Sequence, residues 1–146
     1  MKGLKLLAIL LIAGVAISGC QKIENYDQLS RLIDKEWRLV SITKNGTELA
    51  DSCQLDNTIV FSTNGEITTD FGAVSCEEEL SFQDWKFQKE YAQIRFKGRT
   101  KGDGFSFASY IEQREILELT EKALVLKETY PNGGQEMPRV FTYQVQ

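Results

Sequence analysis

The sequence predicts an all-β domain of eight or nine short antiparallel strands, closed as a barrel or stacked as a sandwich, with one short helix before them. Apolar and polar residues alternate with a period of two in most segments after residue 36, which is typical of strands with one buried face. Asn-Gly pairs at 45–46 and 64–65 favour tight hairpins. The length of 146 residues suits one domain with a single core.

The first twenty residues differ in kind from the rest. Lys2 and Lys5 accompany an uninterrupted apolar stretch of twelve residues, 6–17. A stretch of that length is too short to span about 30 Å of hydrocarbon, but it fits the apolar region of a secretory signal. We therefore expect residues 1–19 to be a signal peptide and the rest of the chain to be exported.

The residues ISGC, 17–20, resemble the lipobox of bacterial lipoproteins, in which an aliphatic residue and two small residues precede a cysteine. The resemblance implies that Cys20 becomes an acylated N-terminus anchored in a membrane, since two or more acyl chains hold a protein firmly. The alternative is an ordinary signal peptide followed by a chance cysteine. Gln21 stands where aspartate would favour inner-membrane retention, so the resemblance implies the outer membrane, with the domain facing the periplasm or the cell exterior. Residues 20–25 are then the lipidated N-terminus and tether, and 26–146 the folded domain.

The charge of the mature domain argues against nucleic acid as a partner. Removal of residues 1–19 takes away Lys2 and Lys5, so 15 of the 17 basic residues stand against 21 acidic ones, a formal charge of −6. The basic residues are scattered along the chain rather than clustered. A nucleic-acid-binding surface needs a concentrated positive patch, which this sequence does not indicate.

The one predicted helix covers residues 26–35. Apolar residues recur there at helical spacing, and Asn25 or Asp27 could cap the N-terminus. The recurring residues are Leu29, Leu32 and Ile33.

Short strands joined by turn residues occupy the chain from the helix to the C-terminus. A first alternating strand, 37–43, ends at Asn45-Gly46, and each later segment has the same pattern. These segments are a hairpin at 56–71, a hairpin at 84–98, a strand at 105–113, a hairpin at 114–130 that turns at 120–122, and, after the turn at 131–134, a strand at 139–145.

Cys53 and Cys76 are the two remaining cysteines, and both lie in polar, turn-like surroundings. An even pair in an oxidising compartment predicts a disulfide, which would restrict the unfolded chain by about 3 kcal/mol in the loop-entropy model. The alternative, a catalytic thiol or a metal ligand, needs a base or further ligands. The chain has no histidine, and neither cysteine has another nearby in the sequence.

The order of these features resembles the lipocalin-like lipoproteins of Gram-negative envelopes. The resemblance rests on the lipobox, the W-x-L-V strand at 37–40, a cysteine before the hairpin NTIVFSTNGE at 57–66, a second cysteine, and aromatic strands at 85–87 and near the C-terminus. Lys35 stands where true lipocalins have glycine, and no Thr-Asp-x-Arg motif occurs later in the chain. The resemblance implies a small antiparallel up-and-down β-barrel of about eight strands, which holds one small ligand or is filled by side chains.

The alternation allows two interpretations of the barrel interior. In the first, a cavity of at least a few hundred Å³ binds or carries a small hydrophobic ligand, with Trp85, Phe87, Phe105 and Phe107 as its preferred wall. In the second, the inward residues fill the lumen, and loops at 43–56 or 98–104 contact a partner protein in the envelope. The residues expected to point inward are Trp37, Leu39, Ile59, Phe61, Ile67, Phe71, Trp85, Phe87, Ile94, Phe96, Phe105, Phe107, Ile111, Leu117, Leu119, Leu124, Leu126, Phe141, Tyr143 and Val145.

The sequence gives little indication of enzymatic chemistry. Without histidine there is no Ser-His or Cys-His pair, no imidazole base and no histidine metal site. The acidic run 77–79 is explained by a solvated loop, and Asp103 between two glycines by a turn. We therefore predict a protein that is not an enzyme, with no catalytic residue, no cofactor and no metal site.

Overall fold

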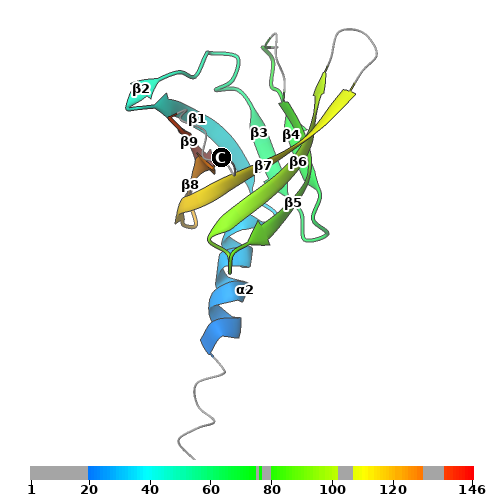
Figure 1. The fold of residues 1–146 in the computed structure, drawn as a ribbon, viewed down its shortest axis with the longest axis vertical. Helices are drawn as coiled ribbons and strands as arrows, with labels where there is room; N and C mark the ends of the chain where they lie inside the picture. Colours follow the sequence, from blue (N-terminus) through cyan, green and yellow to red (C-terminus); the bar gives the residue numbers. More distant parts are fainter. Residues whose placement is uncertain (1–19, 75, 77–79, 102–106, 130–136) are drawn as a thin grey trace, which may run out of the picture. The chain divides into compact units, whose positions relative to one another are not determined.

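The computed structural model describes residues 20–74, 76, 80–101, 107–129 and 137–146 (Figure 1). The chain divides between Ser30 and Arg31 into two units, and all the strands belong to the second, Arg31–Gln146. No helix within the described ranges is long and apolar enough to cross a membrane.

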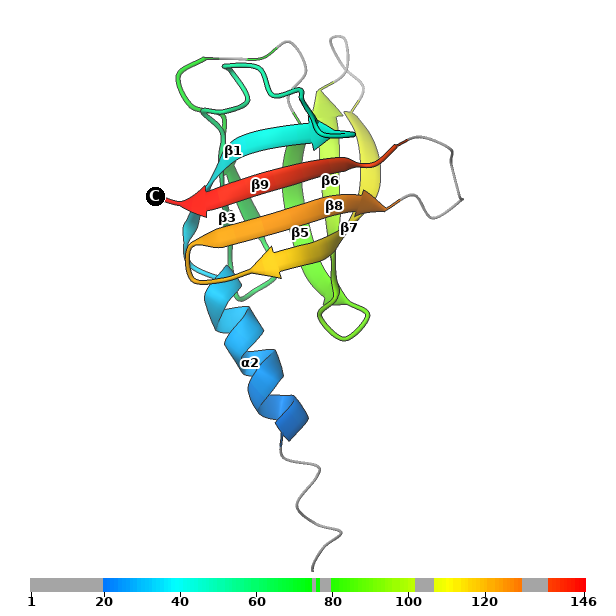
Figure 2. The ribbon, with the colours of Figure 1, turned by 90° about the vertical axis from the view of Figure 1, so that its left-hand side faces the viewer.

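In the described part of the chain, nine strands after the helix α2 form one antiparallel sheet, and eight of them follow one another around a barrel. The sheet has the order β4-β3-β1-β9-β8-β7-β6-β5, while β2 pairs with β1 alone. Figure 2 shows β1, β9 and β8 running side by side. The bounds are α2 (Cys20–Leu32), β1 (Glu36–Lys44), β2 (Thr47–Glu48), β3 (Thr58–Phe61), β4 (Ile67–Asp70), β5 (Leu80–Gln88), β6 (Gln93–Lys101), β7 (Phe107–Leu119), β8 (Ala123–Thr129) and β9 (Arg139–Val145).

Among the described residues, the seam between β4 and β5 is bridged next to Gly65 and Glu66. Glu66 forms an isolated bridge with Asp84, and the backbone N–H of Trp85 donates to the carbonyl of Gly65 at 2.8 Å. Each barrel strand therefore lies beside its successor, and the first strand pairs with the last. The predicted up-and-down barrel of about eight strands is confirmed, and the sandwich alternative is excluded.

The helix begins and ends earlier than predicted. It runs from Cys20 to Leu32, so Asn25 and Asp27 lie inside it and do not cap its N-terminus. Residues 20–25, the expected tether, form its first part. Beyond the helix, Asp34 adopts a left-handed backbone with φ 56°, and its N–H donates to the carbonyl of Phe61 at 2.9 Å, which turns the chain into β1.

The predicted hairpins are found where the turn residues indicate them. Asn45 and Gly46 both have positive φ, 51° and 75°, as a two-residue turn matched to the strand twist requires. The turn at 120–122 joins β7 to β8, and Thr120 Oγ1 accepts from the N–H of Ala123 at 2.9 Å. The sequence predicts a break between the segments 105–113 and 114–119, but residues 107–119 form one strand. The turn predicted at 131–134 lies outside the described residues.

Two residues expected to point inward face solvent instead. Ile111 is 60% exposed and Leu117 50% exposed. In this part of β7 the inward residues are Glu112, which pairs with the buried Phe96, and Arg114, which pairs with the buried Ile94. The prediction was wrong because it assigned the apolar residues of this strand to the interior, although the charged Glu112 and Arg114 occupy inward positions and a register shift between Ile116 and Glu118 interrupts the alternation next to Leu117.

A β-bulge explains a buried residue that the alternation misplaced. The register of β1 with β9 shifts between Leu39 and Ser41, so one extra residue reverses the face of the residues after it. Strict alternation assigns Ile42 to the face opposite Leu39, but both side chains are buried.

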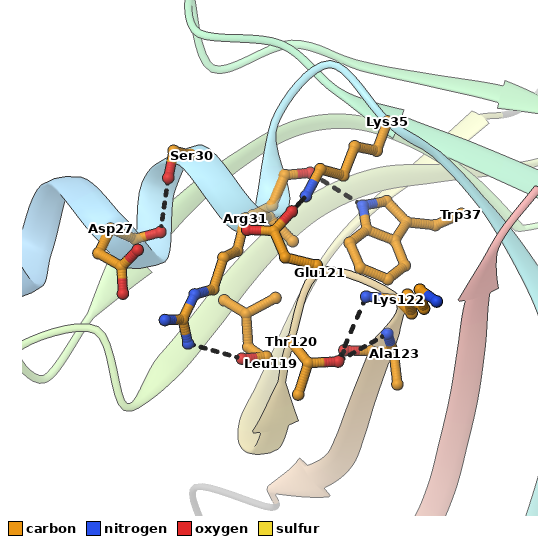
Figure 3. Close-up of polar contacts among 11 residues, drawn as sticks. Asp27, Ser30, Arg31, Lys35, Trp37, Leu119, Thr120, Glu121, Lys122 and Ala123 are labelled. Carbon is orange, nitrogen blue, oxygen red and sulfur yellow. Dashed lines mark hydrogen bonds and ion pairs between the residues drawn. The ribbon is translucent and has the colours of Figure 1, made fainter.

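One end of the barrel, which we call the Trp37 end, is packed with apolar side chains. Trp37, Leu32 and Phe61 are fully buried there, and the indole Nε1–H of Trp37 donates to the carbonyl of Leu32 at 2.8 Å. Figure 3 shows this bond beside the ion pair of Lys35 with Glu121 and the guanidinium of Arg31, whose Nη1 lies 3.5 Å from the carbonyl oxygen of Leu119. The last residues of α2 thus belong to the core of the barrel unit.

Candidate ligand-binding site

A buried arginine lies inside the barrel. Arg114 lies on β7 and is 1% exposed, among the largest fully buried side chains described. Its pairing with Ile94 of β6 places it on the inner face, because directly opposite residues of antiparallel strands share a face. A cation removed from water at this depth needs a charge partner and hydrogen bonds.

The surroundings of Arg114 supply both. Its Nε donates to Glu112 Oε1 at 2.5 Å, and its Nη1 donates to the hydroxyl of Tyr143 at 3.2 Å. The guanidinium carbon lies 3.6 Å from the centre of the Phe141 ring, with Phe96 at 5.3 Å and Phe82 at 5.4 Å, within the range of cation–π attraction.

These contacts fix the protonation of the cluster. Burial alone would lower the pKa of Arg114, but the charge of Glu112, with Tyr143 and the hydrogen bonds, raises it above its usual value. Burial raises the pKa of Tyr143, although Arg114 opposes that change. At neutral pH the lumen therefore holds a guanidinium cation and a protonated phenol.

A second ion pair stands next to the first. Both Nε and Nη2 of Arg139 donate to Glu128 Oε1, at 2.9 and 2.5 Å, and its backbone N–H donates to Glu128 Oε2 at 3.0 Å. Glu128 is buried, and its side-chain hydrogen bonding with Arg139 is the largest cause of a raised pKa of Arg139. The guanidinium of Arg139 lies 5.4 Å from the centre of the Phe141 ring, which therefore contacts both arginines.

A cavity of about 90 Å³ opens beside Arg114. Arg114 is the charged residue of its lining, and Gln54, Asn57, Thr69 and Tyr143 contribute uncharged polar groups. The Oγ1 atom of Thr69 is buried and has no hydrogen-bond partner among the described residues. The remaining lining residues are apolar: Leu39, Ile42, Ile59, Phe82 and Phe141.

This volume corrects one expectation. A carrier of a whole hydrophobic molecule requires several hundred Å³, and the cavity inside the described barrel is far smaller. Arg114 and the aromatic rings around it occupy the space that a larger ligand would need.

Two cross-linked loops stand at the cavity end of the barrel, which we call the disulfide end. Cys53, in the loop 49–57, is bonded to Cys76, in the loop that follows β4 and whose described residues are 71–74 and 76, with a Cα–Cα distance of 5.5 Å. The predicted disulfide is therefore confirmed. Because Gln54 and Asn57 belong to the first of these loops and line the cavity, the cross-link restrains one wall of the site.

Further polar contacts fix the same two loops. Asp56 Oδ2 accepts from the N–H of Ala73 at 2.6 Å. The amide nitrogen of Asn57, oriented as a donor, bonds the carbonyls of Phe71 at 3.1 Å and Cys53 at 3.2 Å. Gly72 has φ 66°, and a Cβ there would collide with the Asp56 side chain, so glycine is required for this approach.

The expected aromatic wall is only partly described, and its described part does not line the cavity. Trp85 is buried between Phe61 and Phe87, with ring centres 5.2 and 5.3 Å away, and its Nε1–H donates to the carbonyl of Ser62 at 3.1 Å. Phe87 also packs on Tyr91 at 4.6 Å. Phe105 lies outside the described residues, as does the side chain of Phe107.

Cys20, the predicted lipidation site, is the first residue of α2, and its side chain lies outside the described part of the chain. The residue that sequence reasoning missed is Arg114. The sequence alone allows this strand to turn either of two faces inward. One face carries Glu112, Arg114 and Ile116, and the other carries Ile111 and Leu117.

The fold and the site together define a small antiparallel β-barrel with a cavity lined by both apolar and polar side chains. No protein-family model and no curated protein sequence matches the chain. A solved structure of a lipocalin-like protein from Bacteroides thetaiotaomicron is similar to it, with 19% sequence identity and a TM-score of 0.48, over 77% of this chain and 94% of that one.

Proposed function

We propose that this chain is an exported lipoprotein, anchored at the outer membrane through acyl chains on Cys20, whose barrel binds a small ligand without transforming it. The observation that carries the proposal is the cavity beside Arg114, where a charged group, uncharged polar groups and apolar side chains converge. Such a mixture of an apolar wall with few polar groups is typical of small-molecule sites.

The envelope location is supported by two independent features of the chain. The N-terminal residues have the pattern of a lipoprotein signal that ends at Cys20. The disulfide between Cys53 and Cys76 favours an oxidising compartment, since cytosolic thiols are kept reduced.

The proposed ligand is small, or enters the barrel only with one end. A volume of about 90 Å³ equals roughly three water molecules of liquid, whereas sites for drug-sized molecules measure about 300–1,000 Å³. A hydrophobic ligand would therefore place a head group beside Arg114 and leave the rest of the molecule at the disulfide end.

Binding without catalysis is proposed because the site lacks the groups that most enzymes of this size use. The sequence has no histidine, and Glu112 and Glu128 are each held in an ion pair with an arginine. A carboxylate so engaged is a poor general base.

Native mass spectrometry of the full chain, purified from its own envelope in mild detergent, tests this proposal. We expect an N-terminal mass equal to a triacylated cysteine at Cys20, and a further non-covalent mass that leaves on collisional activation. An unmodified Cys20 would overturn the proposal of a lipid anchor. An acylated chain with no releasable mass under any mild condition would count against ligand binding.

A second candidate function is a protein-interaction role, favoured by apolar side chains on the two cross-linked loops. Leu49 is 45% exposed and Val74 50% exposed, on the two loops that the disulfide joins. Exposed apolar groups held on a rigid frame favour contact with a partner protein. Crosslinking from position 49 or 74 in the intact envelope is expected to capture one reproducible protein, and its failure at both positions would exclude this role for these loops.

A further inference from the structure

We infer that the group recognised in the cavity is the carboxylate of a small alkyl acid, bound by the guanidinium of Arg114 and the hydroxyls of Tyr143 and Thr69. The inference rests on the proposed function, since it names the class of ligand for the same cavity.

The charge of the lining favours an anion. Arg114 is the charged residue that lines the cavity, while its partner Glu112 is not part of the lining. A guanidinium carries five N–H donors, and the bonds to Glu112 and Tyr143 account for two of them within the described chain. A planar carboxylate is the anion that matches the geometry of the remaining donors.

Two hydroxyl groups extend the set of donors. The Tyr143 oxygen already accepts a hydrogen bond from Arg114 Nη1, so its own proton is directed to another acceptor. The Thr69 Oγ1 is buried with no partner among the described residues, and it belongs to a side chain that lines the cavity. A buried hydroxyl without a partner is costly to keep, and a bound carboxylate oxygen would satisfy it.

The size and the apolar walls select the rest of the ligand. Half of the lining residues are apolar, among them Leu39, Ile59 and Phe82. These walls favour an alkyl group over a second charge, and they favour a carboxylate over the bulkier phosphate in about 90 Å³. The predicted ligand is therefore a short fatty acid, or the acid end of a longer one whose tail leaves the barrel.

The test compares butyrate, butan-1-ol and butylammonium, which share an alkyl chain and differ at the head group. Each is titrated into the full chain in non-ionic detergent, and binding is followed by NMR through the side-chain Nε–H signals of the arginines. We expect butyrate to bind at least about tenfold more tightly than the alcohol, the range of a charge-assisted hydrogen bond, and the ammonium ion not to bind. A shift of the Arg114 signal alone would place the acid in the lumen.

Two conservative variants locate the binding groups, and a third is their control. Thr69→Val and Tyr143→Phe each remove a hydroxyl with little change of shape, so each is expected to weaken butyrate binding by about tenfold. Thr68→Val changes the neighbouring residue on β4, which is exposed, and should leave binding unaltered. Thr69→Val should also leave the stability of the free protein unchanged or higher, because the hydroxyl that it removes has no partner within the described chain.

The outcomes separate this inference from the proposed function. Equal binding of butyrate and butan-1-ol in the lumen would overturn the inference that the ligand is an acid, but it would support the cavity as a ligand site. Butyrate affinity unchanged by both hydroxyl variants would overturn the proposed contacts. No binding by any of the three probes, or by octanoate as a longer acid, would overturn both the inference and the cavity as a ligand site. Octanoate binding more tightly than butyrate would identify a longer acid as the source of the carboxylate.

Discussion

The Trp37 end and the Arg114 region are two parts of one lumen, and they are stabilised in opposite ways. At the Trp37 end the interior is filled by fully buried apolar side chains, including Trp37, Leu32 and Phe61. Around Arg114 the interior holds a cation, its carboxylate partner and a phenol. The first arrangement gains free energy from burial itself, while the second must recover the cost of desolvation through its contacts.

The contrast between the two regions indicates where a small barrel can bind a ligand. An interior filled by buried apolar side chains leaves little room for a ligand and presents few free hydrogen-bonding groups. A buried polar cluster carries directional groups, and at Arg114 it borders the cavity. The two regions should therefore respond differently when a single side chain is changed.

The largest effect is expected when Arg114 loses its partner. Glu112→Gln leaves the guanidinium buried without a counter-charge, which typically costs about 3–5 kcal/mol. The free energy of unfolding measured in urea should fall by that amount. The matched control is Glu115→Gln on the same strand, which loses only an exposed ion pair with Lys127 at 4.0 Å and should cost under about 0.5 kcal/mol.

A double variant sharpens this prediction. Arg114→Met combined with Glu112→Gln removes both charges together, so more than half of the lost stability should return. If the double variant is no more stable than Glu112→Gln alone, the ion pair is not the source of the loss.

The next largest effect is expected at the cross-linked loops of the disulfide end. Cys53 and Cys76 are 23 residues apart, so replacing both with alanine frees a long loop in the unfolded chain and should cost about 3 kcal/mol. Thermal unfolding with and without reductant measures this loss of stability, since the reduced wild type should match the variant in which both cysteines are alanine. Because this loop carries Gln54 and Asn57, ligand affinity should fall as well, and an unchanged affinity would separate the disulfide from the site.

The elements of the fold could be predicted because their signals are local. Alternation located most strands, and Asn45-Gly46 adopts the backbone that its sequence favours. The choice of a barrel over a sandwich was not local, since it depends on β1 pairing with β9 at the far end of the chain. That choice came from the family resemblance rather than from alternation.

The candidate site could not be predicted by the same reasoning. Alternation assigns burial to apolar residues, so it places Ile111 in the interior and leaves Arg114, on the inner face of β7, outside it. A charged residue enters a core when a partner and aromatic rings from distant strands meet it, and those contacts are not visible in a single segment. Bulges such as the one at Leu39 to Ser41 reverse a face without any change of composition.

At the apolar Trp37 end, a change that removes one hydrogen bond should have a smaller effect. Trp37→Phe removes the indole N–H and leaves the carbonyl of Leu32 without this donor in a dry environment, at a cost of about 1–2 kcal/mol. Trp85→Phe is the matched variant, because Trp85 also donates to a carbonyl, that of Ser62, in a turn that water reaches. We expect it to cost less than Trp37→Phe in urea unfolding, and the reverse order would contradict the dry packing of the Trp37 end.

The smallest effect is expected for a carboxylate at the rim of the disulfide end, which sharpens the contrast with Glu112 in the lumen. Hydrogen bonds from the Ser41 hydroxyl and from the N–H groups of Ala50 and Ile42 lower the pKa of Glu48 from 4.5 to about 2. Because the folded pKa is the lower one, the stabilisation by this group is complete above pH 4.5 and is lost as the pH falls toward 2. In urea unfolding across this range, Glu48→Gln should therefore be slightly less stable than the wild type at neutral pH and approach it in acid. The side chain of Glu48 is exposed, and screening by water keeps the loss of stability in Glu48→Gln far below that in Glu112→Gln. A difference in stability that does not change with pH would show that the hydrogen bonds to Glu48, and not its charge, account for the effect.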